Sequence, residues 1–300
     1  MSHLIGSDGR LVRDSWPKGI GHLDGEKISC ASLQDWEKVP PTYYEICSWA
    51  QVALDPSAQE RRRENILVYA KPPATEQHTL FPISIRVQGF LEACCLHRLG
   101  NWKGNPTNAQ RAVHSVTLRS NGEERTWAPI HTAIRHIRQL VQRQLTANNL
   151  YEEPPLDTTD DLRLYHRVFQ KRQRKDPATV LPVSEDPNQF YPAISQHWAL
   201  ADRIQIGRRM ENGGKAACSP LTLSPGDFVD VGITFEIVKQ KQRDGTWGFR
   251  VHLGFSHVLQ LASSDYLKKQ KISDKKRSRD DDMDVDRPTA KIQRTIMSFS

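Results

Sequence analysis

Two long stretches of alternating apolar and polar residues, joined by a short turn, constrain the fold of this 300-residue chain most. The first stretch covers residues 229–237 and the second 247–255, with Asp244-Gly245 between them. Their apolar positions are Val229, Val231, Ile233, Phe235 and Ile237, then Trp247, Phe249, Val251, Leu253 and Phe255. Successive side chains of a β-strand point to opposite faces, so this period of two predicts two strands. The glycine-containing turn predicts that they pair as an antiparallel hairpin.

Shorter segments also favour strands. Residues 66–69 form a compact apolar run, and residues 83–87 alternate between apolar and polar side chains. A second hairpin is predicted from 113–118 and 125–128, because Asn121-Gly122 suits the positive φ angles of a tight turn. Long strands interrupted by glycine occur in small barrels, including the oligonucleotide-binding OB-fold. The sequence therefore predicts an α+β fold whose β-rich C-terminal half is an OB-like barrel or a sandwich.

Two amphipathic helices are expected to accompany these strands. The first would present an apolar stripe at steps of three and four, made of Ile130, Ile134, Ile137, Val141 and Leu145. The second is predicted over 160–175, with Thr159 as its N-cap. Its inner face would hold Leu162, Tyr165, Val168 and Phe169. A shorter helix is expected over 43–54, ending before Pro56.

Composition along the chain predicts three parts. Residues 1–30 are rich in glycine and have little periodicity, so we expect a loosely held arm. Residues 31–262 would form the folded body, with a sub-boundary near 150–158, where Glu152-Glu153-Pro154-Pro155 looks like a linker. From 263 to 300 the chain is charged and has few apolar residues, which is typical of a disordered tail.

The net charge, the cysteine count and the length of the apolar runs indicate the cellular compartment and the kind of partner. The formal net charge is +7, which favours polyanionic partners such as nucleic acid. Five cysteines, an odd count without framework spacing, indicate reduced thiols in the cytosol or nucleus. No apolar run approaches the roughly 18–20 residues that span a bilayer, and the charged N-terminus predicts no secretion signal. We therefore expect a soluble intracellular protein without a membrane partner.

The most concentrated positive charge of the predicted body lies along the two helices. We expect it to contact DNA phosphates, which requires only accessible cations. The residues are Arg135, Arg138 and Arg143 of the first helix, with Lys171, Arg172, Arg174 and Lys175 at the end of the second. The alternative is that these side chains merely solvate two helix surfaces.

The tail contains a basic run typical of a nuclear import signal. Lys275, Lys276, Arg277 and Arg279 follow one another closely and precede acidic residues. Import receptors bind such cations in an accessible segment. The run therefore predicts a nuclear import receptor as a partner and the nucleus as the location.

The last eight residues read Gln-Arg-Thr-Ile-Met-Ser-Phe-Ser. This segment resembles the PCNA-interacting peptide (PIP box) of replication and repair proteins. The resemblance implies that Gln293, Ile296 and Phe299 bind the sliding clamp PCNA, with Phe299 as the first aromatic. A spacing of three places these side chains on one side of a 3₁₀ turn. Ser300 departs from the pattern, since a second aromatic is expected there.

No catalytic motif and no cofactor site can be identified in the sequence. Phosphate-binding loops, nucleophile elbows and zinc-protease motifs are absent from it. Cys94, Cys95 and His97 are close, but adjacent cysteines are poor zinc ligands, so buried thiols are favoured over a metal site. Asp230 and Glu236 could bind a metal on the polar face of the predicted hairpin, although solvent exposure explains them more simply.

These patterns together predict a non-enzymatic accessory protein of nuclear DNA replication or repair, tethered to the sliding clamp. The alternative is a nuclear scaffold whose body binds another protein and makes no contact with DNA. A nuclease or transferase with a dispersed active site is a third hypothesis.

The tail motif predicts a weak interaction with the clamp. A peptide of residues 288–300 should bind PCNA with an affinity of about micromolar order, since one buried ring is missing. Calorimetry should show tighter binding after Ser300→Phe, which restores that ring. Absence of binding heat with both peptides at high concentration would contradict the assignment.

Overall fold

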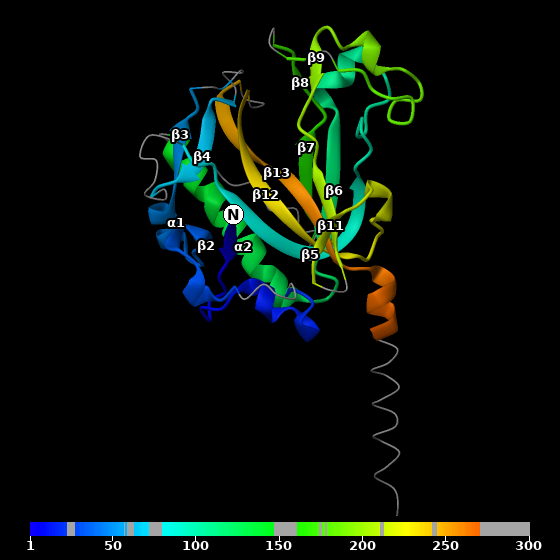
Figure 1. Cartoon of the computed structure of the whole chain (residues 1–300). Coiled ribbons are helices and arrows are strands. Elements are labelled where there is room, and N and C mark those ends of the chain that lie inside the picture. The colour runs from blue at the N-terminus through cyan, green and yellow to red at the C-terminus, as the bar shows by residue number, and fades with distance from the viewer. Residues whose placement is uncertain are drawn as a thin grey trace, which may run out of the picture. The chain divides into compact units, whose positions relative to one another are not determined.

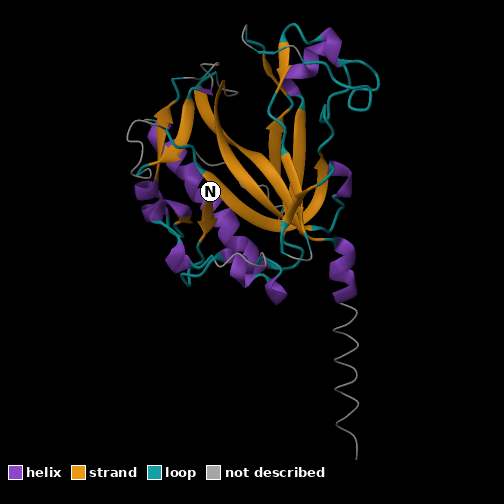
Figure 2. Ribbon diagram, in the orientation of Figure 1, coloured by secondary structure: helices purple, strands orange, loops and turns teal. Residues whose placement is uncertain are grey.

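The computed structural model describes residues 1–22, 28–56, 58, 63–71, 80–146, 161–173, 176–177, 179–210, 213–241 and 245–270. The chain divides into two units, Met1–Ser263 and Ser264–Ser300. The first unit is mixed and rich in strands (Figures 1 and 2). Its helices are α1 (Tyr43–Trp49) and α2 (Glu124–Leu145), with short 3₁₀ helices that include η1 (Val12–Ser15), η6 (Pro106–Arg111), η7 (Tyr191–Ala193) and η8 (Pro220–Thr222).

Thirteen strands are found in the described residues. They are β1 (Ser2–Leu4), β2 (Lys38–Val39), β3 (Ala50–Leu54), β4 (Asn65–Tyr69), β5 (Ser84–Cys95), β6 (Val113–Arg119), β7 (Leu162–Arg167), β8 (Phe169–Lys171), β9 (Trp198–Leu200), β10 (Gln205–Arg209), β11 (Lys215–Ala217), β12 (Phe228–Lys241) and β13 (Trp247–Ala262). All except β8 and β9 belong to one sheet, ordered β11-β10-β13-β7-β6-β5-β12-β4-β3, with β1 paired to β5 and β2 paired to β1.

The predicted hairpin is confirmed as β12 and β13, which pair antiparallel from Phe228↔Ala262 to Lys241↔Trp247. β12 also pairs antiparallel with β5, β5 with β6, and β6 with β7. β7 then meets β13 in parallel at Tyr165↔Gly254. Strands β5, β6, β7, β13 and β12 are therefore paired in a closed cycle, and the other strands extend from it.

Helix α2 confirms the first predicted helix and begins earlier than its apolar stripe. The turn that precedes α2 has positive φ angles of 54° at Asn121 and 92° at Gly122. Across this turn, Ser120 Oγ contacts Glu124 Oε1 at 2.6 Å. The predicted turn is therefore present, but it joins β6 to a helix. The prediction of a strand over 125–128 was wrong, because these residues belong to α2, in which Trp127 is buried and packs on the sheet beside Gly89.

The second predicted helix was also wrong, since residues 162–171 form β7 and β8. Leu162 and Leu164 are buried and alternate with exposed Arg163 and Tyr165. Apolar residues at 162, 165, 168 and 169 fit a helix as well, but pairing of β7 with β6 selects the period of two. The shorter predicted helix ends at Trp49, after which 50–54 form β3.

The N-terminal residues do not form a loose arm where they are described. β1 pairs in parallel with β5 and β2, and Leu11, Val12 and Trp16 are buried. The Trp16 ring makes edge contacts with Phe90 and Phe228 at centroid distances of 5.8 and 4.9 Å. Aromatic burial thus holds a segment whose glycines suggested mobility.

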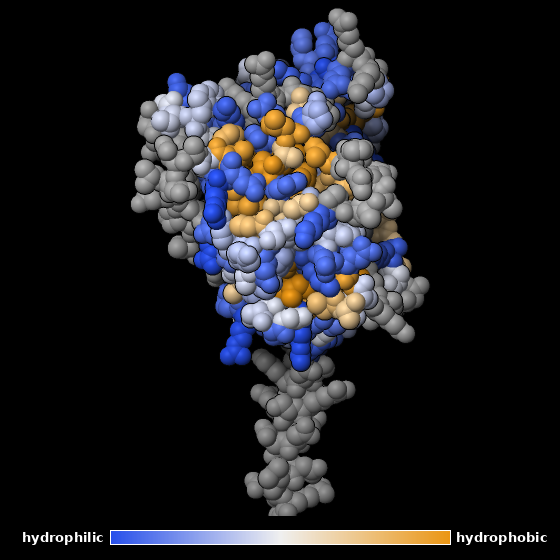
Figure 3. All heavy atoms as spheres, turned by 90° about the vertical axis from the view of Figure 1, so that its left-hand side faces the viewer, coloured by the Kyte–Doolittle hydropathy of each residue, from blue (hydrophilic) through white to orange (hydrophobic). Residues whose placement is uncertain are grey.

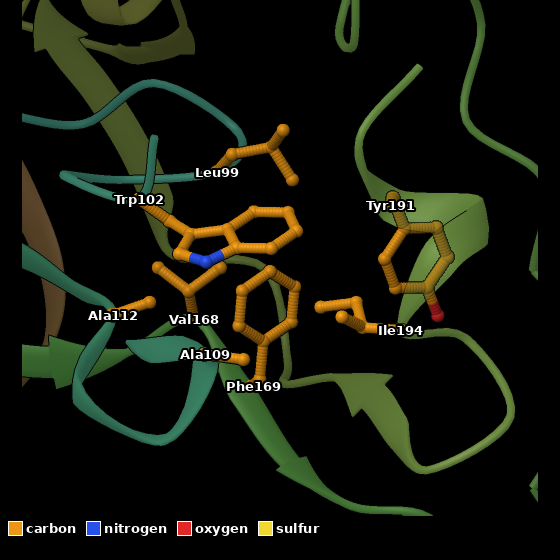
Figure 4. Packing of buried hydrophobic residues seen from close by; sticks show 8 residues of the cluster. All are labelled: Leu99, Trp102, Ala109, Ala112, Val168, Phe169, Tyr191 and Ile194. Carbon is orange, nitrogen blue, oxygen red and sulfur yellow. The ribbon is translucent and has the colours of Figure 1, made fainter. Parts of the chain in front are cut away.

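A second hydrophobic cluster lies apart from α2, around β8 and β9. Trp102, Phe169 and Tyr191 are its large members, with a centroid distance of 5.0 Å between the Trp102 and Phe169 rings. Figure 4 shows these rings converging from the loop after β5, from β8 and from η7. Gly104 approaches the Phe190 ring so closely that a Cβ there would lie 2.6 Å from it.

The second unit is described only over 264–270, which are helical. The prediction of disorder was therefore wrong for these residues. Residues 271–300, with the import signal and the clamp peptide, lie outside the described residues, as does the predicted sub-boundary near 150–158. No described helix is long and apolar enough to cross a membrane.

The contact between α2 and the sheet predicts a specific stability effect. A Cβ at Gly89 would lie 2.7 Å from Cζ3 of Trp127, so Gly89→Ala should lower the free energy of unfolding by about 1–3 kcal/mol through overpacking. Denaturant titration of a double-mutant cycle with Trp127→Leu should show a smaller cost of Gly89→Ala once the indole is gone. Equal costs in both backgrounds would contradict this contact.

Candidate nucleic-acid interface

A row of polar and aromatic side chains covers the face of β6 and β7 that points away from the buried leucines. We call it the β6–β7 face, and it consists of Ser115, Thr117, Arg119, Arg163, Tyr165 and Arg167. Alternation places them there: Leu162 and Leu164 are 5% and 0% exposed, whereas Tyr165 is 41% exposed. The register sets Arg163 opposite Thr117 and Tyr165 opposite Ser115.

Small neighbours leave the Tyr165 ring uncovered. Ser115 lies across from it on β6 and Gly254 across from it on β13. A Cβ at Gly254 would lie 2.5 Å from Thr234 Oγ1, so the glycine is required by close packing there. The aromatic ring therefore stands between two positions without large side chains, with arginines before and after it on the same strand.

Ion pairs anchor two of the three arginines of the face. Arg119 Nη1 lies 2.6 Å from Glu92 Oε2, and Arg167 Nε lies 3.6 Å from Glu236 Oε1. Glu236 also contacts Arg63, so one carboxylate faces two guanidinium groups. Exposed Arg163 and Arg250 add to this charge. Arginine exceeds carboxylate here, so this surface has a net positive charge.

His252 lies beside this cluster, opposite Glu236 on the hairpin. Burial, with the positive charge of Arg250 and other arginines, lowers the pKa of His252 below its usual value of 6.5. The imidazole is therefore neutral at pH 7, and the positive charge of the region comes from arginines.

A large cleft lies beside the C-terminal part of β13, at His257–Leu259. Its volume is about 1400 Å³, and its lining includes the end of β13, strands β10 and β11, the 184–190 loop and the residues after β5. Its aliphatic side chains are Leu96, Leu99, Ile204, Ile206, Leu221, Val258 and Leu259. Arg98 and Arg203 lie on its wall and share Glu185: Arg98 Nε is 3.5 Å from the carboxylate, and Arg203 Nη2 contacts its other oxygen.

His114 also lines the cleft and is almost fully buried. Burial, helped by the neighbouring His166, lowers the pKa of His114 to about 4, so it carries no charge at neutral pH. The cleft is positive through arginine and lysine side chains.

Asp230 is buried, contrary to the expectation that it faces solvent. Its carboxylate accepts hydrogen bonds from Arg86 at 3.1 and 3.0 Å and from Gln88 at 3.0 Å, and His257 Nε2 lies 3.7 Å away. Burial alone would raise its pKa, but His257, Arg86 and Gln88 outweigh that effect and lower it from 3.8 to about 2. Asp230 is thus a structural counterion of Arg86.

The predicted DNA-binding cations are not brought together. Arg135 and Arg143 are exposed on α2, Arg138 is half-buried, and Lys171 is exposed on β8. Figure 1 shows β8 at the upper right, far from α2. Arg172 donates to the carbonyls of Ser195, Asp176 and Pro177, which makes it a structural residue. Arg174 and Lys175 lie outside the described residues, as do Lys275, Lys276, Arg277, Arg279, Gln293, Ile296 and Phe299.

The five cysteines are free thiols, but Cys94 and Cys95 are half-buried and not fully buried as predicted. Burial raises the pKa of Cys94 and of Cys95, which disfavours the thiolates that bind metals. Within the described residues, no group of three or more His, Cys, Asp or Glu side chains could hold a metal ion.

The sequence reading missed Arg163, Tyr165 and Arg167 as site residues. Their signal was present as Leu-Arg-Leu-Tyr-His-Arg, in which leucines alternate with large polar side chains. Assigning these residues to a helix hid that alternation.

A separate apolar area is visible on the side of the molecule that carries β3 and α1 (Figure 3). Leu54 of β3 is 67% exposed.

The buried ion pair predicts a pH-dependent stability. Asp230→Asn should lower the free energy of unfolding by about 3–5 kcal/mol at pH 7, because Arg86 loses its counterion. The pKa of Asp230 is lower in the folded state, so its contribution is present above about pH 4 and lost as the pH falls towards 2. Denaturant titrations should therefore show the wild-type advantage shrinking over that range. Asp202→Asn, at an exposed position, should show no such difference, and a pH-independent gap for Asp230→Asn would contradict the assignment.

No protein-family model matches this sequence, and no curated protein matches it. The candidate interface is therefore interpreted from its own geometry.

Proposed function

We propose that this protein binds single-stranded nucleic acid through the β6–β7 face and acts as a non-enzymatic accessory protein of DNA replication or repair in the nucleus. The observation that carries the proposal is the row Arg163, Tyr165, Arg167, in which an uncovered aromatic ring lies between two arginines. Every nucleobase has a face on which a ring can stack, and every nucleotide brings a phosphate.

The spacing of the row suits a single strand. Alternate residues of a β-strand are about 6.6 Å apart, since each residue rises about 3.3 Å. Arg163 and Arg167 are four residues apart, about 13 Å, so they can meet phosphates two nucleotides apart on either side of a stacked base in an extended backbone. In duplex DNA the base faces are already stacked on one another, so Tyr165 would lose its role and only the phosphate contacts would remain.

The strand order also supports the proposal. Five strands paired in a closed cycle are what an OB-like barrel requires, and OB-folds bind oligonucleotides on the face of their second and third strands. In chain order β6 and β7 are the second and third strands of this cycle. This correspondence in strand order supports the choice of β6 and β7 as the proposed interface.

The tail motifs support a nuclear role at replication sites. The basic run at 275–279 would serve import, and Gln293, Ile296 and Phe299 would tether the protein to PCNA. A weak clamp peptide and a weak nucleic-acid surface on one chain reinforce each other. Once the peptide is bound to the clamp, the nucleic-acid surface is held near the DNA, so its effective concentration there rises. A scaffold role is the second candidate, and the aliphatic cleft favours it.

The proposal predicts which substitutions weaken binding of a labelled oligothymidylate. Tyr165→Ala should lower the affinity by about 1–3 kcal/mol through lost stacking. Arg163→Ala should reduce the slope of log affinity against log salt by about 0.7. The matched controls are Tyr44→Ala, since Tyr44 is 83% exposed on α1, and Arg135→Ala on α2.

Fluorescence anisotropy with full-length protein should also show weaker binding to a duplex of the same length. A comparison with an RNA strand tests whether the site distinguishes ribose from deoxyribose. Unchanged affinity in Tyr165→Ala and Arg163→Ala would refute the β6–β7 face. If Arg135→Ala reduced the salt slope instead, α2 would be the phosphate-binding surface.

A further inference from the structure

The cleft has features that nucleic-acid binding on the β6–β7 face does not use. Its volume of about 1400 Å³ exceeds the roughly 300–1000 Å³ of most small-molecule sites, so it has room for a segment of a polymer. Leu221 on η8 lines it and is 80% exposed. A large aliphatic side chain so exposed beside a cleft with an aliphatic lining is a common feature of interaction sites.

The charge of the cleft wall is the second feature. Arg98 and Arg203 share the single carboxylate of Glu185, and Arg98 has only 18% of its side chain exposed. Burial, followed by the nearby charge of Arg203, lowers the pKa of the Arg98 guanidinium. The other acidic groups are occupied elsewhere, since Asp230 pairs with Arg86 and Asp186 accepts the backbone N–H groups of Phe190 and Tyr191. A positive charge therefore remains beside the cleft without a matching carboxylate among these residues.

These two features favour a peptide over a nucleic acid. Nucleobases need exposed aromatic faces, but Trp102 of the lining is only 7% exposed and donates its indole N–H to Asn105 O. Phe190, which also lines the cleft, is half-buried and packs edge-on against the Trp102 ring. Leucine, isoleucine and valine walls suit apolar side chains instead. Carboxylates satisfy the arginines as well as phosphates do.

We propose that the cleft binds an extended segment of another protein in which acidic and apolar residues alternate. Its carboxylates would pair with Arg98 and Arg203, and its apolar side chains would pack on Leu221, Leu259 and their aliphatic neighbours. β11 lines the cleft and is the last strand on its side of the described sheet. An extended segment can therefore add main-chain hydrogen bonds along β11, as in β-strand addition. This second site is independent of the β6–β7 face.

The test uses full-length protein and a fluorescein-labelled peptide of about 12 residues, which spans about 40 Å when extended. Glutamate occupies every second position, and Leu, Phe and Ser occupy the others. A second peptide has lysine in place of every glutamate, and an oligothymidylate serves as a competitor. Anisotropy should show binding of the acidic peptide in the micromolar range and at least tenfold weaker binding of the basic one.

Two exposed lining residues give variants that leave the fold intact. Arg203→Gln and Leu221→Ser should each weaken binding of the acidic peptide by about fivefold or more, the amount that loss of one ion pair or one apolar contact produces. The matched controls are Arg208→Gln and Val180→Ser, at exposed positions outside the cleft lining, and they should change the affinity less than about twofold.

The oligothymidylate should not displace the acidic peptide, and Tyr165→Ala should leave peptide binding unchanged. The proposal is overturned if the acidic peptide fails to bind, if Arg203→Gln and Leu221→Ser behave like their controls, or if these variants weaken oligothymidylate binding and not peptide binding. In the last case the cleft is part of the nucleic-acid site.

Discussion

The antiparallel pairing of β12 with β13 is the constraint on which the rest of the architecture depends. One edge of β12 pairs with β13, and its other edge pairs first with β5 and then with β4. The free edge of β13 receives β7 and then β10. Both faces of the first part of β12 are covered, so Phe228–Ile233 are all buried although their side chains alternate in polarity. A hairpin this long supplies enough edge to join two halves of a sheet, and each strand of the candidate interface takes its position from it.

Asp230 on this hairpin lies beneath the N-terminal segment and is buried, so its charge needs partners inside the protein. Asp230 would be costly to bury alone, but Arg86 and Gln88 from β5 provide its hydrogen bonds. Gln88 also donates to Gly21 O, which ties the N-terminal segment to the same network. The alternation that suggested a solvent-exposed face instead builds a buried ion pair. A charge pair of this kind specifies one arrangement of β5, β12 and the N-terminus, because any other leaves a buried charge unpaired.

The two surfaces with positive charge differ in what surrounds their arginines. On the β6–β7 face an exposed aromatic ring lies among arginines and small polar residues, which suits a base and its phosphates. In the cleft the arginines lie among leucine, isoleucine and valine, and they already share a carboxylate. Charge alone therefore does not distinguish the partners, whereas the neighbouring side chains do. This is why the net charge of the chain indicated polyanionic partners but not the residues that would meet them.

The sequence by itself determined the β12–β13 hairpin, the α2 stripe and the alternating segment at 83–87, because each has a period that favours one secondary structure. The apolar run at 66–69 predicted β4 without such a period, and the full length of β5 was not predicted. Residues 162–169 fit both periods, and only pairing with β6 decided that they form strands and thereby created the row of Arg163, Tyr165 and Arg167. Tertiary contacts likewise decided that residues 1–22 are held, through Trp16 and Gln88, and that Asp230 is buried. The pattern of apolar residues in the sequence indicates which side of a helix or strand is apolar. It does not indicate which other element covers that side, and that choice depends on residues far apart in the chain.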